Sequence, residues 1–169
     1  MNICVIGTGY VGLVTGAIFA ELGNEVICVD KIAKKIEMLT NGKMPIYEPG
    51  LEELVTRNRN EGRLEFITDL KSAVERSEII FICVNTPSME NGETDLSYIK
   101  NAAKEIALAI NGYKIIVNKS TVPVGTGDLV RDIIKEFRPN NEKFDVVSNP
   151  EFLREGSAIN DALNPDRII

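Results

Sequence analysis

The sequence predicts a doubly wound α/β domain, in which helices cover both faces of a mostly parallel sheet. Short apolar runs rich in β-branched residues alternate with segments whose apolar residues recur every three or four positions, which is typical of successive βαβ units. One run, IIFICV at residues 79–84, is apolar at every position, as expected of a strand covered on both faces. A glycine-rich turn follows the first run directly, where this fold class passes from strand to helix.

Each expected strand is short and mostly aliphatic or aromatic, and each expected helix has apolar residues along one face. In chain order, the strands are expected at residues 3–6, 26–29, 64–67, 79–84, 115–117 and 144–147. The helices that alternate with them are expected at residues 11–22, 33–39, 51–58, 70–74, 99–110 and 129–137. At the end of the chain, PDRII (residues 165–169) is expected to form a turn and the beginning of another strand. A natural domain rarely stops inside such an element, so we expect the chain to be part of a longer protein.

Length and charge narrow the class of partner. A chain of 169 residues is best interpreted as one domain with its own core. Its apolar fraction of 44% and charged fraction of 26% are those of an ordinary globular protein. The net charge is −6 and the basic residues are scattered, which argues against nucleic acid or an anionic membrane, since both select for a concentrated basic face. A small-molecule partner is expected instead.

The composition also limits location and chemistry. No apolar run approaches the roughly 20 residues that span a bilayer, and the N-terminus has no signal-peptide pattern. Cys4, Cys28 and Cys83 have no metal-ligand spacing and fall inside expected strands. We therefore expect a reducing cytoplasm, inert buried thiols and no metal site. The chain has no histidine, so any proton transfer must use carboxylates, lysine, tyrosine, hydroxyls or water.

Three polar or Gly/Pro-rich loops each begin at the end of an expected strand, at residues 85–96, 119–127 and 149–156. The ligand crevice of an open α/β sheet lies outside the carboxyl ends of its strands. We therefore expect these loops to converge on one site.

The glycine-rich turn is GTGYVG at residues 7–12. In a dinucleotide-binding, Rossmann-like fold, Gly7 permits the tight turn, Gly9 lets the backbone approach a pyrophosphate, and Gly12 allows the helix to pack closely on the strand. Asp30 closes the second strand, 18 residues after Gly12, where a carboxylate accepts hydrogen bonds from ribose hydroxyls and repels a 2′-phosphate. This favours NAD over NADP. FAD or a methyl donor remains an alternative, because related folds bind these as well.

Longer motifs resemble one family. GTGYVGLVTG (residues 7–16), PIYEPGL (45–51), KSTVPVGT (119–126), NPEFLREGSA (149–158) and NPDR (164–167) are similar to segments of the UDP-glucose/GDP-mannose dehydrogenase family. The resemblance extends over essentially the whole chain, which corresponds to the N-terminal NAD-binding domain at residues 1–169. The segments that begin at Ser120 and Arg154 favour the UDP-glucose branch over the GDP-mannose branch.

The resemblance implies an oxidoreductase that converts the C6 alcohol of UDP-glucose to the carboxylate of UDP-glucuronate, with two NAD⁺ and one water. It implies an aldehyde-level intermediate and a thioester on a cysteine in a later part of the protein, together with a central helix and a UDP-sugar-binding domain absent from this chain. The chain alone is expected to be inactive and the full-length protein to be a homo-oligomer. Another nucleotide-sugar dehydrogenase, or a non-catalytic NAD-binding module, remains the alternative.

For the cofactor, the resemblance assigns residues along the whole dinucleotide. They are Gly7, Gly9, Tyr10, Val11, Gly12, Asp30, Lys35, Thr86, Thr121 and Glu155. A hydroxyl just beyond a strand is often only a turn former or helix cap, but the stiff VPVG segment after Thr121 supports its assignment. Asn85 stands where the family commonly has glycine, and Ile32 where it frequently has an acidic residue.

Glu151 is the main catalytic candidate, with Thr121 as its expected hydrogen-bonding partner. On residue type alone, Glu151 would be a solvated loop acid, and Phe152 and Leu153 would be core residues. The resemblance instead assigns Glu151 to activation of the hydrolytic water. It also assigns the UDP-sugar contacts, made partly through the backbone, to Glu151, Phe152, Leu153, Arg154 and Glu155.

Overall fold

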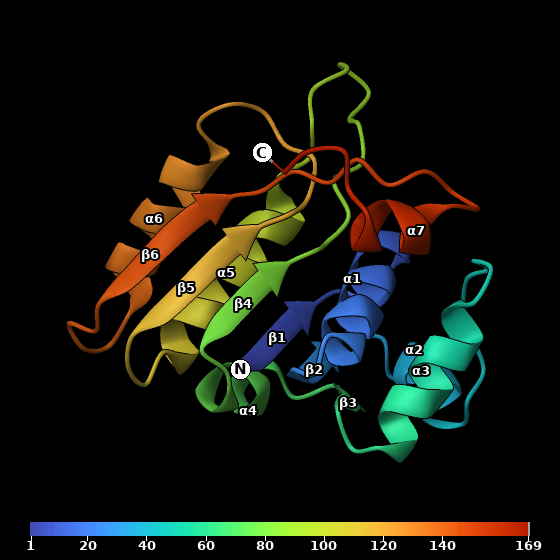
Figure 1. Ribbon diagram of the computed structural model, residues 1–169. Helices are drawn as coiled ribbons and strands as arrows, with labels where there is room; N and C mark the ends of the chain where they lie inside the picture. The colour runs from blue at the N-terminus through green and yellow to red at the C-terminus, as the bar shows by residue number, and fades with distance from the viewer. Residues whose placement is uncertain (169) are drawn as a thin grey trace.

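A parallel sheet forms the centre of the computed structural model, which describes residues 1–168 (Figure 1). The strands in these residues are β1 (Asn2–Ile6), β2 (Glu25–Val29), β3 (Leu64–Ile67), β4 (Ile79–Ile82), β5 (Lys114–Asn118) and β6 (Phe144–Ser148). The helices are α1 (Tyr10–Glu21), α2 (Ala33–Thr40), α3 (Leu51–Asn60), α4 (Leu70–Arg76), α5 (Ser97–Ala109), α6 (Thr126–Phe137) and α7 (Ala158–Leu163).

The strand order is β3-β2-β1-β4-β5-β6, and every neighbouring pair is parallel. The chain winds outward from β1 through β2 to β3, then returns to β4 on the other side of β1. The order therefore reverses between β1 and β4, and a crevice opens at the carboxyl ends of these two strands. The predicted fold class is confirmed.

The helices form a layer on each face of the sheet (Figure 1). α1, α2, α3 and α7 share one apolar cluster with the sheet, while α4, α5 and α6 share the other. β1 contributes alternate side chains to both clusters, Val5 to the first and Cys4 to the second, because successive residues of a strand point to opposite faces. This explains why the strands read as continuous apolar runs.

The six expected strands and six expected helices are confirmed, with ends shifted by a few residues. The structure adds one helix, α7, which sequence periodicity missed because it has only six residues. The strand expected to begin within PDRII does not form as far as Ile168, since residues 165–168 pair with no strand in the described part of the chain. Residue 169 lies outside the described residues.

The three cysteines lie in the core, as expected. Cys4 and Cys28 have no exposed surface and Cys83 is 6% exposed, and none of them forms a disulfide within residues 1–168. Burial raises the pKa of the Cys83 thiol to about 12, so very little thiolate forms at neutral pH. None of the helices in residues 1–168 combines the length and apolar character needed to cross a bilayer.

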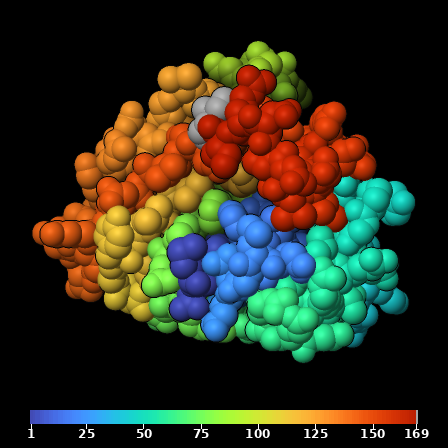
Figure 2. Space-filling model, in the orientation of Figure 1, coloured from blue at the N-terminus to red at the C-terminus, as the bar shows by residue number. Residues whose placement is uncertain are grey.

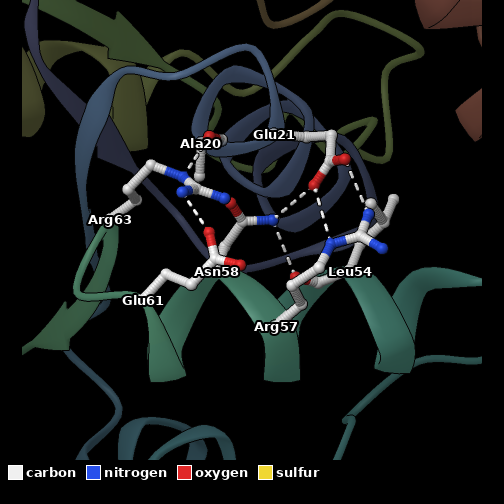
Figure 3. A network of polar contacts seen from close by, with 7 residues as sticks. All are labelled: Ala20, Glu21, Leu54, Arg57, Asn58, Glu61 and Arg63. Carbon is white, nitrogen blue, oxygen red and sulfur yellow. Dashed lines mark hydrogen bonds and ion pairs between the residues drawn. The ribbon is translucent and has the colours of Figure 1, made fainter.

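A polar network attaches α3 to the carboxyl end of α1 (Figure 3). Its centre is Asn58, a fully buried residue whose amide nitrogen donates to Glu21 and whose amide oxygen accepts from Arg63. Arg57 also donates two hydrogen bonds to Glu21, and Arg63 donates to the carbonyl of Ala20 at the end of α1. The network therefore joins α3 and Arg63 to the end of α1.

We expect Asn58→Ala to destabilise the domain by about 1–3 kcal/mol, because it leaves buried donors and acceptors without partners. Urea denaturation followed by circular dichroism measures the change. Asn60→Ala is the matched control, since Asn60 is exposed on the same helix, and exposed substitutions usually change stability by less than about 0.5 kcal/mol. Equal effects of the two substitutions would contradict the assigned role of the network.

Candidate functional site

Three adjoining pockets lie along the carboxyl ends of the strands. The first is lined by residues that include Gly7, Gly9, Asp30 and Lys35, and the second by residues that include Tyr10, Thr86 and Thr121. These two pockets share Gly9 and Asn85. The third lies under residues 149–154 and shares Glu151 with the second. The loops expected to converge do so, and together they line one elongated crevice.

The turn after β1 is closed by backbone contacts that only glycine permits. Gly7 has a φ of +104°, and a Cβ there would lie 2.4 Å from the carbonyl oxygen of Cys83. A Cβ on Gly12 would lie 1.9 Å from the carbonyl oxygen of Gly7. Any side chain at either position would force α1 away from β1 and β4.

Gly9 has a different environment from its two neighbours in the motif. A Cβ built on Gly9 would have only the Asn85 amide oxygen nearby, at 3.8 Å, and would otherwise occupy the crevice. Gly9 is also the N-cap of α1, and no side chain in residues 1–168 caps the helix there. The free N–H groups and the positive end of the helix therefore face a cradle suited to a phosphate, as a dinucleotide requires.

Asp30 directly follows β2, lines the first pocket and is held by several hydrogen bonds. One carboxylate oxygen accepts hydrogen bonds from the N–H and hydroxyl of Thr8, at 3.1 and 2.8 Å, and lies 3.4 Å from the Lys35 ammonium. The other oxygen accepts from the Ile32 N–H at 3.0 Å, which leaves a lone pair available to a ligand. Burial works to raise the pKa of Asp30, but the hydrogen bonds from Ile32 and Thr8 outweigh it and lower the pKa.

The second pocket continues from Gly9 towards β5. Tyr10 and Val11 line it from the first turn of α1, and Thr86 and Thr121 line it from the loops after β4 and β5. The Thr86 hydroxyl donates to the carbonyl of Thr121 at 3.0 Å. This bond ties the two loops together beside the crevice.

Glu151 lines both the second and the third pockets, at the place where they meet. Its carboxylate accepts a hydrogen bond from the Leu153 N–H at 2.6 Å, a local turn of the kind that acidic side chains form. Thr121 lines the same pocket, but no direct hydrogen bond joins it to Glu151 within the described residues. The expected pairing of these two side chains is therefore not formed.

The residues after Glu151 have four different environments. Phe152 is 57% exposed beneath the Arg167 guanidinium, whereas Leu153 packs against the core. Arg154 forms a two-point ion pair with Asp161 of α7, at 2.6 and 3.0 Å. Glu155 is exposed and lines none of the three pockets, so this structure places it outside the crevice to which it was assigned.

Two residues of the crevice were missed from the sequence. Asn85 lies in the loop that follows β4 and lines the first and second pockets opposite Gly9. Lys119 lines the third pocket, and its ammonium donates to the Asn149 side chain at 3.2 Å. Burial lowers the pKa of Lys119, although the nearby Cys83 and Glu151 oppose that change. The feature of the sequence that could have indicated both residues is their position just after β4 and β5, at the carboxyl ends of the strands.

Comparison with known proteins gives a consistent result. A sequence model described as the UDP-glucose/GDP-mannose dehydrogenase family, NAD binding domain, matches residues 1–169. UDP-glucose 6-dehydrogenase TuaD of Bacillus subtilis is 58% identical over 99% of the chain, and UDP-glucose 6-dehydrogenase of Rhizobium meliloti is 55% identical over all of it. The chain spans 36% and 39% of the lengths of these two relatives.

Two solved structures share the fold closely. A ternary complex of GDP-mannose dehydrogenase from Pseudomonas aeruginosa superposes with a TM-score of 0.96 at 42% identity, over 99% of this chain and 40% of that one. A UDP-glucose dehydrogenase from Pyrobaculum islandicum superposes with a TM-score of 0.95 at 43% identity, over 98% of this chain and 39% of that one.

Asp30→Asn should change how stability depends on pH. Because the pKa of Asp30 is lower in the folded chain than its unfolded value of about 3.9, its charge stabilises the fold fully above that value. The stabilisation is lost as the pH falls through the folded-state pKa. The difference in unfolding free energy between wild type and Asp30→Asn should therefore be largest near neutrality and should shrink below about pH 4. Urea titrations at successive pH values measure it, and a difference that stays constant with pH would contradict the assignment.

Proposed function

Since the chain belongs to the UDP-glucose/GDP-mannose dehydrogenase family, as its NAD-binding domain, we propose that it serves the NAD-dependent oxidation of UDP-glucose to UDP-glucuronate. The observation that carries this proposal is the continuity of the crevice. Its pockets join at Gly9 and Asn85 and again at Glu151. A dinucleotide that begins at Asp30 therefore ends beside the loop assigned to the sugar nucleotide.

The adenosine half of NAD is held at the first pocket. Asp30 accepts from the ribose hydroxyls, and its four intramolecular donors fix the direction of its carboxylate. The N–H groups that begin α1 hold the pyrophosphate against Gly9, since a helix N-terminus binds anions. Lys35 contributes positive charge at the edge of the same pocket.

The nicotinamide half lies in the second pocket, where Tyr10, Val11, Thr86 and Thr121 form the wall. NAD supplies the hydride acceptor for oxidation of the alcohol. The fixed loops around Thr86 and Thr121 orient the reacting groups, and orientation of this kind accounts for a large part of the rate enhancement in many enzymes.

Glu151 acts as the proton acceptor that activates water, because it is the carboxylate at the junction of the cofactor pocket and the third pocket. The chain has no histidine, so within this chain the step depends on a carboxylate, lysine, tyrosine, hydroxyl or water, and Glu151 and Lys119 both line the third pocket. The backbone and side chains of residues 152–154, which line the third pocket, contact the sugar nucleotide, with Phe152 as an exposed aromatic surface.

The remainder of the chemistry is supplied outside this chain. The three cysteines here are buried, and a buried thiol is a poor nucleophile, so the thioester cysteine belongs to the part of the protein that the relatives have in addition. We expect the isolated chain to bind NAD without turning over UDP-glucose. A cytoplasmic location and a homo-oligomeric full-length protein belong to the same proposal.

GDP-mannose is the second candidate substrate, because the TM-score of 0.96 to a GDP-mannose dehydrogenase is no lower than that to the UDP-glucose enzyme. Fold similarity therefore does not separate the two branches. Sequence favours UDP-glucose, since the relatives at 55–58% identity are UDP-glucose 6-dehydrogenases.

The isolated chain should bind NAD more tightly than NADP, because Asp30 faces the position of a 2′-phosphate. A hundredfold excess of NAD over its dissociation constant should stabilise the fold by about 2.7 kcal/mol. Melting temperature and tyrosine fluorescence measure the binding. Asp30→Ala should reduce the difference between the dissociation constants for NAD and NADP. Equal binding of NAD and NADP by the wild type would contradict the cofactor assignment.

The full-length protein should produce two NADH for each UDP-glucose consumed, and little with GDP-mannose. Glu151→Gln should lower kcat by about 10²- to 10⁴-fold, the usual contribution of a general base. Glu90→Gln is the control, since Glu90 is an exposed loop carboxylate. NADH absorbance measures both rates. Faster turnover of GDP-mannose than of UDP-glucose would show that the protein is a GDP-mannose dehydrogenase. A Glu151→Gln variant with wild-type activity would show that Glu151 is not the general base.

A further inference from the structure

Glu48 is a buried carboxylate that none of the roles described above uses. It lies in the segment between α2 and α3 and is only 5% exposed. It accepts hydrogen bonds from the Tyr10 hydroxyl, from the Gly156 N–H at 2.7 Å and from the Ala158 N–H at 2.9 Å. A buried charge persists only where several donors compensate for its lost hydration. Here those donors come from two distant segments of the chain.

The donors also show why the charge is tolerated. Ala158 begins α7, where the N–H groups have no partner within the helix, and Gly156 lies just before the N-cap of that helix. Burial works to raise the pKa of Glu48, but the hydrogen bonds from Tyr10, Gly156, Ala158 and Ile159 outweigh it and lower the pKa. The carboxylate is therefore ionised at neutral pH and holds the start of α7.

These bonds bring together three segments that are far apart in the sequence. The space-filling view shows the C-terminal residues against the segment that contains Glu48 (Figure 2). Tyr10 adds the third segment, because it begins α1 next to Gly9 and lines the second pocket. Its hydroxyl also approaches the Arg154 carbonyl at 3.4 Å. Glu48 thus connects the first turn of α1 to the loop that carries Glu151.

We propose that Glu48 is a positioning residue that holds the loop of residues 149–157 in register with the glycine-rich turn. The inference rests on the proposed function, in which the turn binds NAD and the loop binds the sugar nucleotide. Glu48 touches neither ligand. It acts through Tyr10 on one side and through Gly156 and Ala158 on the other, so its loss leaves both binding surfaces intact but misaligned.

The test compares Glu48→Gln with wild type in the full-length protein. Glutamine has the same shape, but both oxygens of Glu48 accept hydrogen bonds from backbone N–H groups. The NH₂ group of glutamine cannot accept such a bond, so one of these N–H groups loses its partner and the loop has to shift. We expect the KM for UDP-glucose to rise about tenfold, in line with the loss of a buried charged acceptor, while the KM for NAD stays near the wild-type value. Tyr10→Phe, which keeps the ring and removes one donor, should raise the KM for UDP-glucose by about threefold.

Glu21→Gln is the matched control. Glu21 also accepts three side-chain hydrogen bonds from a distant helix, but it lines none of the three pockets. We expect this variant to lower the melting temperature and to leave both KM values unchanged. Rises of the two KM values by the same factor in Glu48→Gln, or an effect no larger than that of Glu21→Gln, would overturn the positioning role.

Hydrogen exchange separates this proposal from the function on which it rests. The Leu153 and Arg154 amides do not contact Glu48, yet they should exchange faster in Glu48→Gln than in wild type or Glu21→Gln, while β4 exchanges as before. Unchanged exchange at these amides would overturn the role of Glu48. A wild-type protein that produces no NADH from UDP-glucose would refute the proposed substrate, and the exchange measurement would still decide on Glu48.

Discussion

The backbone contact between the first strand and the first helix determines the geometry of the whole crevice. Gly7 and Gly12 let the start of α1 touch the end of β1 and the backbone at Cys83, at distances that a single Cβ would violate. Because the helix begins this close to the sheet, its free N–H groups point over the carboxyl ends of β1 and β4. Asp30 on one side and Asn85 on the other are then within reach of the same ligand.

The fold was predictable from the sequence wherever a segment was long or its apolar pattern complete. Strands covered on both faces must be apolar at successive positions, so β4 was recognisable at once. α7 was not recognisable, because its six residues are too few to show a period and its first N–H groups are satisfied by Glu48, 110 positions away from Ala158. The strand expected to begin within residues 165–169 does not form as far as Ile168 for a related reason, since a β-rich segment forms a strand only when a partner strand lies beside it.

The site divides in a similar way. The glycines and Asp30 follow from their spacing, because the turn and the ribose contact demand those residue types. Asn85 and Lys119 could not be assigned from the sequence, since an amide or a lysine at the end of a strand has many possible roles. Only the arrangement of the neighbouring loops in the structure shows that these two residues line the crevice. Phe152 and Leu153 are both apolar, so the sequence gives no reason to place their side chains differently, but they have different environments in the structure. One side chain is left in solvent and the other packs in the core.

The buried cysteines have a practical consequence for work on this domain. Cys4 and Cys28 lie in the adjacent strands β1 and β2, and Cys83 directly follows β4 on the other side of β1. A thiol reagent reaches Cys4 and Cys28 only when these strands separate, because the two side chains have no solvent contact in the folded chain. The rate at which these two thiols are modified therefore reports on how often the central sheet opens, without any introduced label. A ligand that closes the crevice over β1 and β4 would slow that rate.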